Sequence, residues 1–238
     1  MRAVALSIAM AALALAQTKF EVASVKPTTT QGSFTINMPP GGRFSGKNLT
    51  IQILLRMAYG LQDYQISGGP AWINSAGFDI EAKAAEGEEV PREQVLKMIQ
   101  SLLADRFLLV LHRETQQLPV YNLVVSKTGL RIQAADSGAE PDRTLKMGHL
   151  NAHKTSMANL AVLLAFDLKR PVKDETGLKG DFAFTLEWAL GLGESDAGQA
   201  SGPSLFTAVQ EQLGLKLEAA RGPVEVVVID HLEKPSEN

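Results

Sequence analysis

Histidines are the first residues in this sequence with a spacing that could do chemistry. His149 and His153 stand four positions apart, a spacing at which two imidazoles can share one metal ion if the segment is helical. The residues around them predict a short strand at His149–Ala152, and no third ligand lies nearby in the sequence. We therefore expect two exposed histidines and no metal site.

Acidic residues could act as the paired acid and base of glycoside hydrolysis, which needs two carboxylates on either side of the bond. Asp174, Glu175 and Asp181 surround the turn T-G-L-K-G, and Asp230 ends the last predicted strand. Turn formation by aspartate and solvation of glutamate explain these residues more simply.

Motifs for other reactions are missing. His112–Glu114 ends a predicted strand, where successive side chains point to opposite faces, so this triplet predicts a surface charge pair. The sequence contains no G-x-S-x-G, H-E-x-x-H or G-x-G-x-x-G, and Ser204 belongs to a helix start. Gly68–Pro70 lacks the lysine of a phosphate loop and predicts a turn. We expect no catalytic residue and no cofactor.

Aromatic residues gather around that turn. Tyr59, Tyr64 and Trp72 are the candidate binding residues, because aromatic rings beside a Gly/Pro loop can form a platform for a peptide or a sugar. The alternative is that these rings, with Phe78, fill the core between a helix and a hairpin, which the burial tendency of aromatic residues favours. Edge strands, which can accept an added strand, are a second candidate surface.

The elements that would position these residues follow from hydrophobic periodicity. Alternating residues predict strands, and apolar positions three and four apart predict helices. Thr50 and Ser156 are predicted caps, Pro91 suits the first turn of a helix, and Phe78, Ile80, Ala82 and Ala84 share one strand face. Two hairpins are expected, with the strands Phe107–Arg113 and Pro119–Ser126, and Leu215–Glu218 and Val224–His231.

A weaker copy of the pattern at Arg43–Ala84 returns about a hundred residues later, which predicts an internal duplication. Corresponding positions differ by 106 residues or, further along, by 104, as in the pairs Phe44 and Leu150, Thr50 and Ser156, and Phe78 and Phe182. The expected fold class is α+β, with two tandem β-α-β-β-α-β-β modules whose helices pack on small, mainly antiparallel sheets. A single interleaved domain is the alternative.

The expected domain organisation has four parts: a signal peptide at 1–16, a first module at 17–132, a linker at 133–148 and a second module at 149–238. Met1–Ala16 has one basic residue, an apolar run and an Ala-Leu-Ala ending, which together predict export. Export places the chain in the periplasm or outside the cell, with no stable membrane span after cleavage. The 238 residues include no cysteine, so core packing alone must stabilise the fold.

Charge excludes one class of partner. The formal net charge is −3, and lysine and arginine are scattered singly. A nucleic-acid binder has a basic patch or stripe, so we expect no nucleic acid as partner.

Several long blocks then mark a resemblance. They are FEVASVKP at 20–27, AYGLQDYQISGGPAWINSAGFDIEAKA at 58–84, LLADRFLLVLHRETQQLPVYNLVVSK at 102–127, RPVKDETGLKGDFAFTLEW at 170–188, and the C-terminal stretch from Gly202. This chain resembles the "soil-associated" exported family abundant in acidobacteria, which is classed as a domain of unknown function. Some relatives are fused to membrane-embedded metallopeptidases of the antibiotic-sensor type, which implies sensing or partner binding outside the membrane.

In element order each half is also similar to the short N-terminal modules of secretins and TonB-dependent transducers, which bind proteins in the periplasm. The resulting hypothesis is an exported, non-enzymatic binding or protein-interaction module of the cell envelope. Its expected partner is an envelope protein or a cell-wall or sugar ligand. The alternative is a carbohydrate-active hydrolase that uses paired carboxylates.

Overall fold

A computed structural model of the chain describes residues 19–29, 32–85, 90–136, 138, 143–189 and 202–235. Within these ranges the fold is mixed α/β, with four α-helices and three small sheets. The chain forms two compact units. Unit 1 comprises residues 1–115 and 225–238, and unit 2 comprises residues 116–224.

Unit 1 contains a four-stranded antiparallel sheet in the order β1-β5-β3-β2. Its strands are β1 (Val22–Pro27), β2 (Thr35–Asn37), β3 (Arg43–Leu49) and β5 (Phe78–Lys83). The predicted strand face is confirmed, because Phe78, Ile80 and Ala82 are buried and alternate with less buried polar residues. One face of this sheet therefore belongs to the core.

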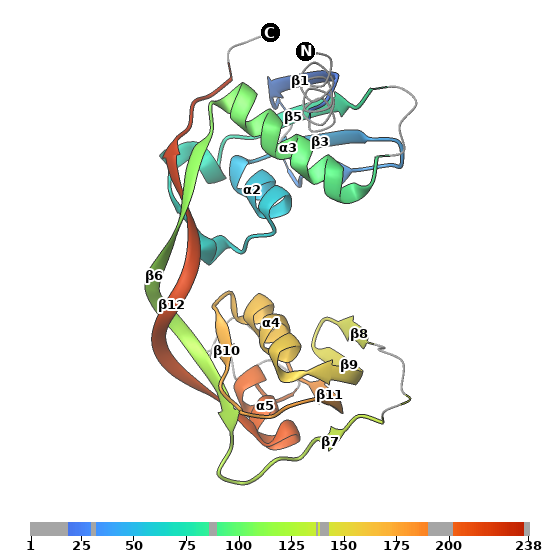
Figure 1. Ribbon diagram of the computed structural model, residues 1–238, viewed down its shortest axis with the longest axis vertical. Helices are drawn as coiled ribbons and strands as arrows, with labels where there is room; N and C mark the ends of the chain where they lie inside the picture. The colour runs from blue at the N-terminus through green and yellow to red at the C-terminus, as the bar shows by residue number, and fades with distance from the viewer. Residues whose placement is uncertain are drawn as a thin grey trace, which may run out of the picture. The chain divides into compact units, whose positions relative to one another are not determined.

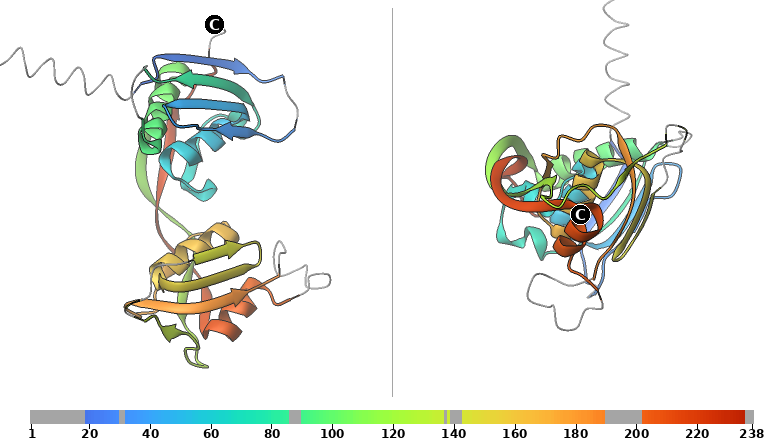
Figure 2. Two further views of the ribbon diagram at one scale, coloured as in Figure 1. Left: turned by 90° about the vertical axis from the view of Figure 1, so that its right-hand side faces the viewer. Right: turned by 90° about the horizontal axis from the view of Figure 1, so that it is seen from below.

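Two helices cover that face of the sheet (Figure 2). Helix α2 (Ile51–Tyr59) begins at the predicted cap, where Thr50 Oγ1 accepts a hydrogen bond from the Ile53 amide at 3.3 Å. It ends at Gly60, whose φ of 66° suits a residue without a side chain. Helix α3 (Arg92–Phe107) follows Pro91. The buried residues of both helices are spaced three and four apart, as the apolar periodicity predicts. Phe107, expected to begin a strand, is instead the buried last residue of α3.

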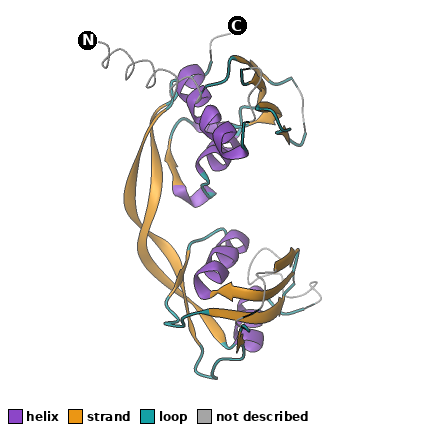
Figure 3. Cartoon of the chain, turned by 45° about the vertical axis from the view of Figure 1, so that its right-hand side comes forward, coloured by secondary structure: helices purple, strands orange, loops and turns teal. Residues whose placement is uncertain are grey.

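Unit 2 also places helices against an antiparallel sheet, in the strand order β7-β11-β9-β8 (Figure 3). The strands are β7 (Gln133–Ala134), β8 (Arg143–Lys146), β9 (His149–Ser156) and β11 (Asp181–Glu187). Helix α4 (Met157–Leu168) is capped by Ser156 as predicted, and helix α5 (Leu205–Leu213) by Ser204.

The third sheet has the order β10-β6-β12-β4 and consists of two long strands and two short ones (Figure 1). The long strands are β6 (Val110–Val125) and β12 (Leu215–His231), and each passes from one unit into the other. In unit 1, β4 (Ile66–Gly68) pairs in parallel with residues 227–229 of β12. In unit 2, β10 (Val172–Asp174) pairs in parallel with residues 121–123 of β6. Unit 1 therefore contains a strand segment from the C-terminal end of the chain, whereas unit 2 is a continuous stretch of the chain.

The prediction of two hairpins is wrong, because β6 and β12 are each one continuous strand. The expected turns were the connections between the predicted strands, residues 114–118 and 219–223. They stay extended because β6 and β12 are hydrogen-bonded neighbours in the sheet and satisfy each other's backbone groups. Pro119 and Pro223 are exposed within these strands, where a missing N–H group is tolerated if it does not interrupt the ladder.

Other boundaries differ from those expected. The chain passes from unit 1 to unit 2 between residues 115 and 116 and returns to unit 1 between residues 224 and 225. The expected modules were 17–132 and 149–238. The expected linker at 133–148 contains β7 and β8, because both strands pair within the sheet of unit 2. The expected signal peptide at 1–16 lies outside the described residues, as do residues 86–89 and 190–201.

Candidate functional site

Trp72 lies in a short 3-10 helix, η2 (Ala71–Asn74), directly after the Gly68–Pro70 turn. Its ring packs edge-on against Phe78, with centroids 6.2 Å apart, and Phe78 packs in the same way against Phe107 at 5.0 Å. The Lys234 ammonium group lies 5.7 Å from the centre of the Trp72 ring. Trp72 is half-buried against the core of unit 1, so packing occupies part of its surface.

The two tyrosines are half-buried as well. Tyr59 ends α2 and packs against the core, and burial raises its pKa while the positive charge of Arg113 acts in the opposite direction. Tyr64 lies in a second 3-10 helix, η1 (Asp63–Gln65), and burial raises its pKa too. Among the described residues no ring contact joins Tyr59, Tyr64 and Trp72. The structure does not assemble the three into one stacked platform.

A hollow of about 350 Å³ lies instead beside the outward face of α2. We call it the α2 hollow; its lining residues are Phe34, Ile36, Ile53, Arg56, Met57, Gly60, Leu61 and Gln62. Most of the lining is apolar, and the volume is at the low end of the range for small-ligand sites, about 300–1,000 Å³. The α2 hollow therefore combines a volume of about 350 Å³ with a mainly apolar lining.

Arg56 is the charged residue in this lining. Its Nε atom lies 3.4 Å from Asp63 Oδ1, which is within ion-pair distance. The geometry is not that of a hydrogen bond, so the buried Nε has no hydrogen-bond partner among the described residues. Asp63 Oδ1 already accepts a hydrogen bond from Gln52 Nε2 at 2.9 Å. The α2 hollow thus combines apolar walls with one weakly partnered cation.

Sequence reasoning missed this site. It considered only the inward residues of α2 (Ile51, Leu54, Leu55 and Ala58), which the structure buries. Ile53 and Met57 are four residues apart and form a second apolar row on the helix, next to Arg56. This second row is the feature of the sequence that could have indicated the site. Phe34 and Ile36 could not be assigned to the same place, because their approach to α2 depends on the β2–β3 pairing.

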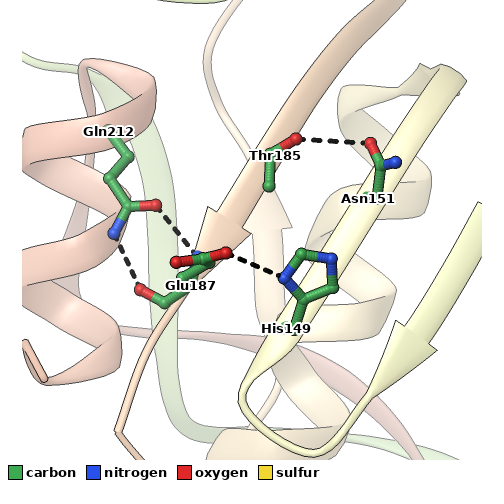
Figure 4. A network of polar contacts seen from close by, with 5 residues as sticks. All are labelled: His149, Asn151, Thr185, Glu187 and Gln212. Atoms are coloured by element: carbon green, nitrogen blue, oxygen red, sulfur yellow. Dashed lines mark hydrogen bonds and ion pairs between the residues drawn. The ribbon is translucent and has the colours of Figure 1, made fainter. Parts of the chain in front are cut away.

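The histidines considered for metal binding lie on the outward side of β9. His149 Nδ1 lies 3.2 Å from Glu187 Oε1 on the neighbouring strand β11 (Figure 4). Gln212 of α5 forms two hydrogen bonds with the backbone of Glu187. Its Nε2 donates to the Glu187 carbonyl at 2.7 Å, and its Oε1 accepts from the Glu187 amide at 2.9 Å. His149 and His153 are four strand residues apart, about 13 Å, too far to share an ion. This cluster is a polar sheet surface.

A second histidine makes closer contacts with acids. His112 Nδ1 lies 2.9 Å from both carboxylate oxygens of Asp230, and its Nε2 lies 3.7 Å from Glu114. The hydrogen bond to Asp230 raises the pKa of His112, and Glu114 contributes in the same direction. Beside it, Arg113 forms an ion pair with Glu225. All five side chains are substantially exposed, which fits the predicted surface charge pairing on a strand.

Among the remaining acidic candidates, Asp181 begins β11 and Asp174 stabilises the turn after β10. Asp174 Oδ1 accepts hydrogen bonds from the Thr176 amide at 3.0 Å and from the Thr176 hydroxyl at 2.7 Å. This is the local bonding with which aspartate stabilises turns. Across the described residues, no group of three or more His, Cys, Asp or Glu side chains is arranged to hold a metal ion.

No helix in the described part of the chain is long and apolar enough to cross a membrane. The chain belongs to the family described as "Protein of unknown function (DUF3738)", whose sequence model matches residues 52–232. This confirms the expectation that the chain contains a domain of unknown function. The match includes Tyr59, Tyr64, Trp72 and the part of the α2 hollow from Ile53 to Gln62. No curated protein and no solved structure matches the chain.

Proposed function

We propose that this protein is an exported, non-enzymatic binding or protein-interaction module of the cell envelope. The observation that carries the proposal is the α2 hollow, a site of ligand size lined mainly by apolar side chains. Apolar surface exposed in a concave site is favourable for association, because contact with a ligand removes it from water.

Export is the part of this proposal that rests on sequence. The basic, apolar and Ala-Leu-Ala segments of Met1–Ala16 have the order of a signal peptide. Export directed by this segment would place the chain in the periplasm or outside the cell. An envelope protein or a cell-wall or sugar ligand is then the expected partner.

We also propose that the two units arose by duplication. The supporting observation is the shared element order, β3-α2-β4-β5-α3-β6 and then β9-α4-β10-β11-α5-β12. In both series the short strand after the first helix pairs in parallel with a long strand. This order agrees with the suggested similarity to the modules of secretins and TonB-dependent transducers, and such modules act by binding proteins.

The hydrolase alternative has less support. None of the residues lining the α2 hollow is acidic. Glu114 and Asp230 both approach His112, but they do so on an exposed strand surface. Glycoside hydrolysis requires two carboxylates on either side of a bound sugar, which such a surface does not provide.

A ligand screen tests the proposal. Envelope extracts, small molecules and glycans are added to ¹⁵N-labelled protein lacking residues 1–16, and the amide signals of Gly60, Leu61 and Gln62 are followed. We expect at least one compound to shift these signals and Met57→Gln to weaken its binding. The control variant Val162→Gln changes an apolar side chain in unit 2 that is 69% exposed, and it should bind normally. Turnover of a glycan without binding at the α2 hollow would contradict the proposal.

A further inference from the structure

The α2 hollow limits the shape of its occupant. Ile53 and Met57 extend from α2, Leu61 follows the helix, and Phe34 and Ile36 face them from β2 and the residue before it. These side chains offer dispersion contacts and no hydrogen bonds, so they suit a hydrocarbon body. The volume of about 350 Å³ suits a small molecule, and a chain of roughly six to eight carbons matches this low end of the range.

Arg56 determines the charge of the occupant. Its side chain is 38% exposed, and its terminal guanidinium nitrogens donate no hydrogen bond to another described residue. Guanidinium has five N–H donors in a fixed plane that matches a carboxylate. An anionic head group placed beside Arg56 would therefore gain charge-assisted hydrogen bonds without displacing a protein partner.

Asp63 lowers the net positive charge beside the α2 hollow. Its carboxylate lies 3.4 Å from Arg56 Nε and already offsets part of the positive charge. The cost of dehydrating an anion rises faster with its charge than its attraction to Arg56 does, so this partly neutralised site favours a carboxylate over a phosphate dianion. Asp63 is also held by Gln52, so the ion pair keeps the guanidinium beside the hollow.

We infer that the α2 hollow binds a small apolar monocarboxylate, with the hydrocarbon chain against Ile53, Met57 and Leu61 and the carboxylate on Arg56. This inference rests on the proposed binding function and adds the chemical class of the ligand. It commits to a free small-molecule acid, because the hollow has the volume of a single short chain.

The test uses three probes that differ in their head group only. Hexanoate carries the negative charge, hexanamide is uncharged with almost the same shape, and hexylammonium is positive. Each is titrated into ¹⁵N-labelled protein lacking residues 1–16, and the amide shifts of Gly60, Leu61 and Gln62 give the affinity. We expect hexanoate to bind with a Kd on the order of 1 mM, as its size allows, and at least about tenfold more tightly than hexanamide.

Variants assign this preference to Arg56. Arg56→Met should reduce the affinity for hexanoate to that for hexanamide and leave hexanamide unchanged, whereas Arg56→Lys should retain part of the preference. The matched control is Arg43→Met, because Arg43 is an exposed arginine of unit 1 outside the hollow.

The outcomes separate the two proposals. Equal affinity for hexanoate and hexanamide, or an unchanged preference in Arg56→Met, overturns the assignment of a carboxylate ligand and leaves the binding site in place. If no probe shifts Gly60–Gln62 and no compound of the broader screen does so, the binding function itself is refuted.

Discussion

A substitution at Ile229 tests whether the C-terminal strand is part of the core of unit 1. Ile229 is 6% exposed and belongs to the core of unit 1, although it lies in the C-terminal strand β12. Its backbone neighbour in the sheet is Gly68 of β4. We predict that Ile229→Ala destabilises unit 1, which the sequence predicts to end about a hundred residues earlier.

The expected magnitude follows from burial. Truncation of a buried isoleucine to alanine costs about 2–5 kcal/mol, through lost transfer free energy and the cavity that remains. Since Ile229 is almost fully buried, we expect about 3 kcal/mol, which corresponds to a roughly hundredfold faster exchange of the most protected amides.

Native-state hydrogen exchange measures this change residue by residue. In Ile229→Ala, amides of α2, α3 and β5 should exchange faster, while those of α4 and β11 should keep their wild-type rates. Leu123→Ala is the reciprocal variant, because Leu123 of β6 is fully buried in the core of unit 2. Loss of protection in unit 2 after Ile229→Ala, or no loss in unit 1, would refute this reasoning.

Three further predictions concern single residues of unit 1. Trp72→Ala should lower the free energy of unfolding by about 1–3 kcal/mol, because the ring is half-buried and packs edge-on against Phe78; a change below about 0.5 kcal/mol in urea unfolding would contradict this packing role. Gly69→Ala should cost about 1–3 kcal/mol in the same assay, because φ is +82° and a Cβ atom would lie 3.0 Å from Ile229 Cδ1; an unchanged midpoint would contradict this. Because Asp230 raises the pKa of His112 in the folded state, the stability from this pair is fully present below the unfolded pKa of about 6.5 and is lost as pH rises through the folded pKa; an NMR titration should show a lower pKa for His112 in Asp230→Asn, and an unchanged pKa would refute the assignment.

Local periodicity and capping chemistry explain which elements the sequence could predict. Thr50 and Ser156 cap helices as expected, and the inward residues of α2 and α3 follow the helical period. The buried alternation of β5 follows in the same way. These features depend on residues at most a few positions apart, so the sequence contains the necessary information.

The long strands could not be predicted, because their cause is not local. Residues 114–118 and 219–223 lie between the predicted strand segments, yet they belong to the continuous, hydrogen-bonded strands β6 and β12. The parallel pairs of Ile66 with Val227 and of Val172 with Tyr121 join distant parts of the chain. Such pairings are chosen by tertiary packing, which overrides local propensity.

The candidate site, like the fold, could be predicted from the sequence only in part. The turn at Gly68–Pro70 was readable, since glycine and proline signal turns directly. The α2 hollow was not readable, because Phe34 and Ile36 reach α2 only through the fold of β2 onto β3. Tyr64 and Trp72 were chosen for their residue type, and this choice as binding residues stays a prediction.

The measurement that tests the central claim most directly is the position of a bound ligand. Intermolecular nuclear Overhauser effects are recorded between the tightest compound of the screen and methyl-labelled protein lacking residues 1–16. We predict contacts to the methyl groups of Ile53, Met57 and Leu61, which line the α2 hollow. Contacts confined to residues outside this hollow would contradict the account.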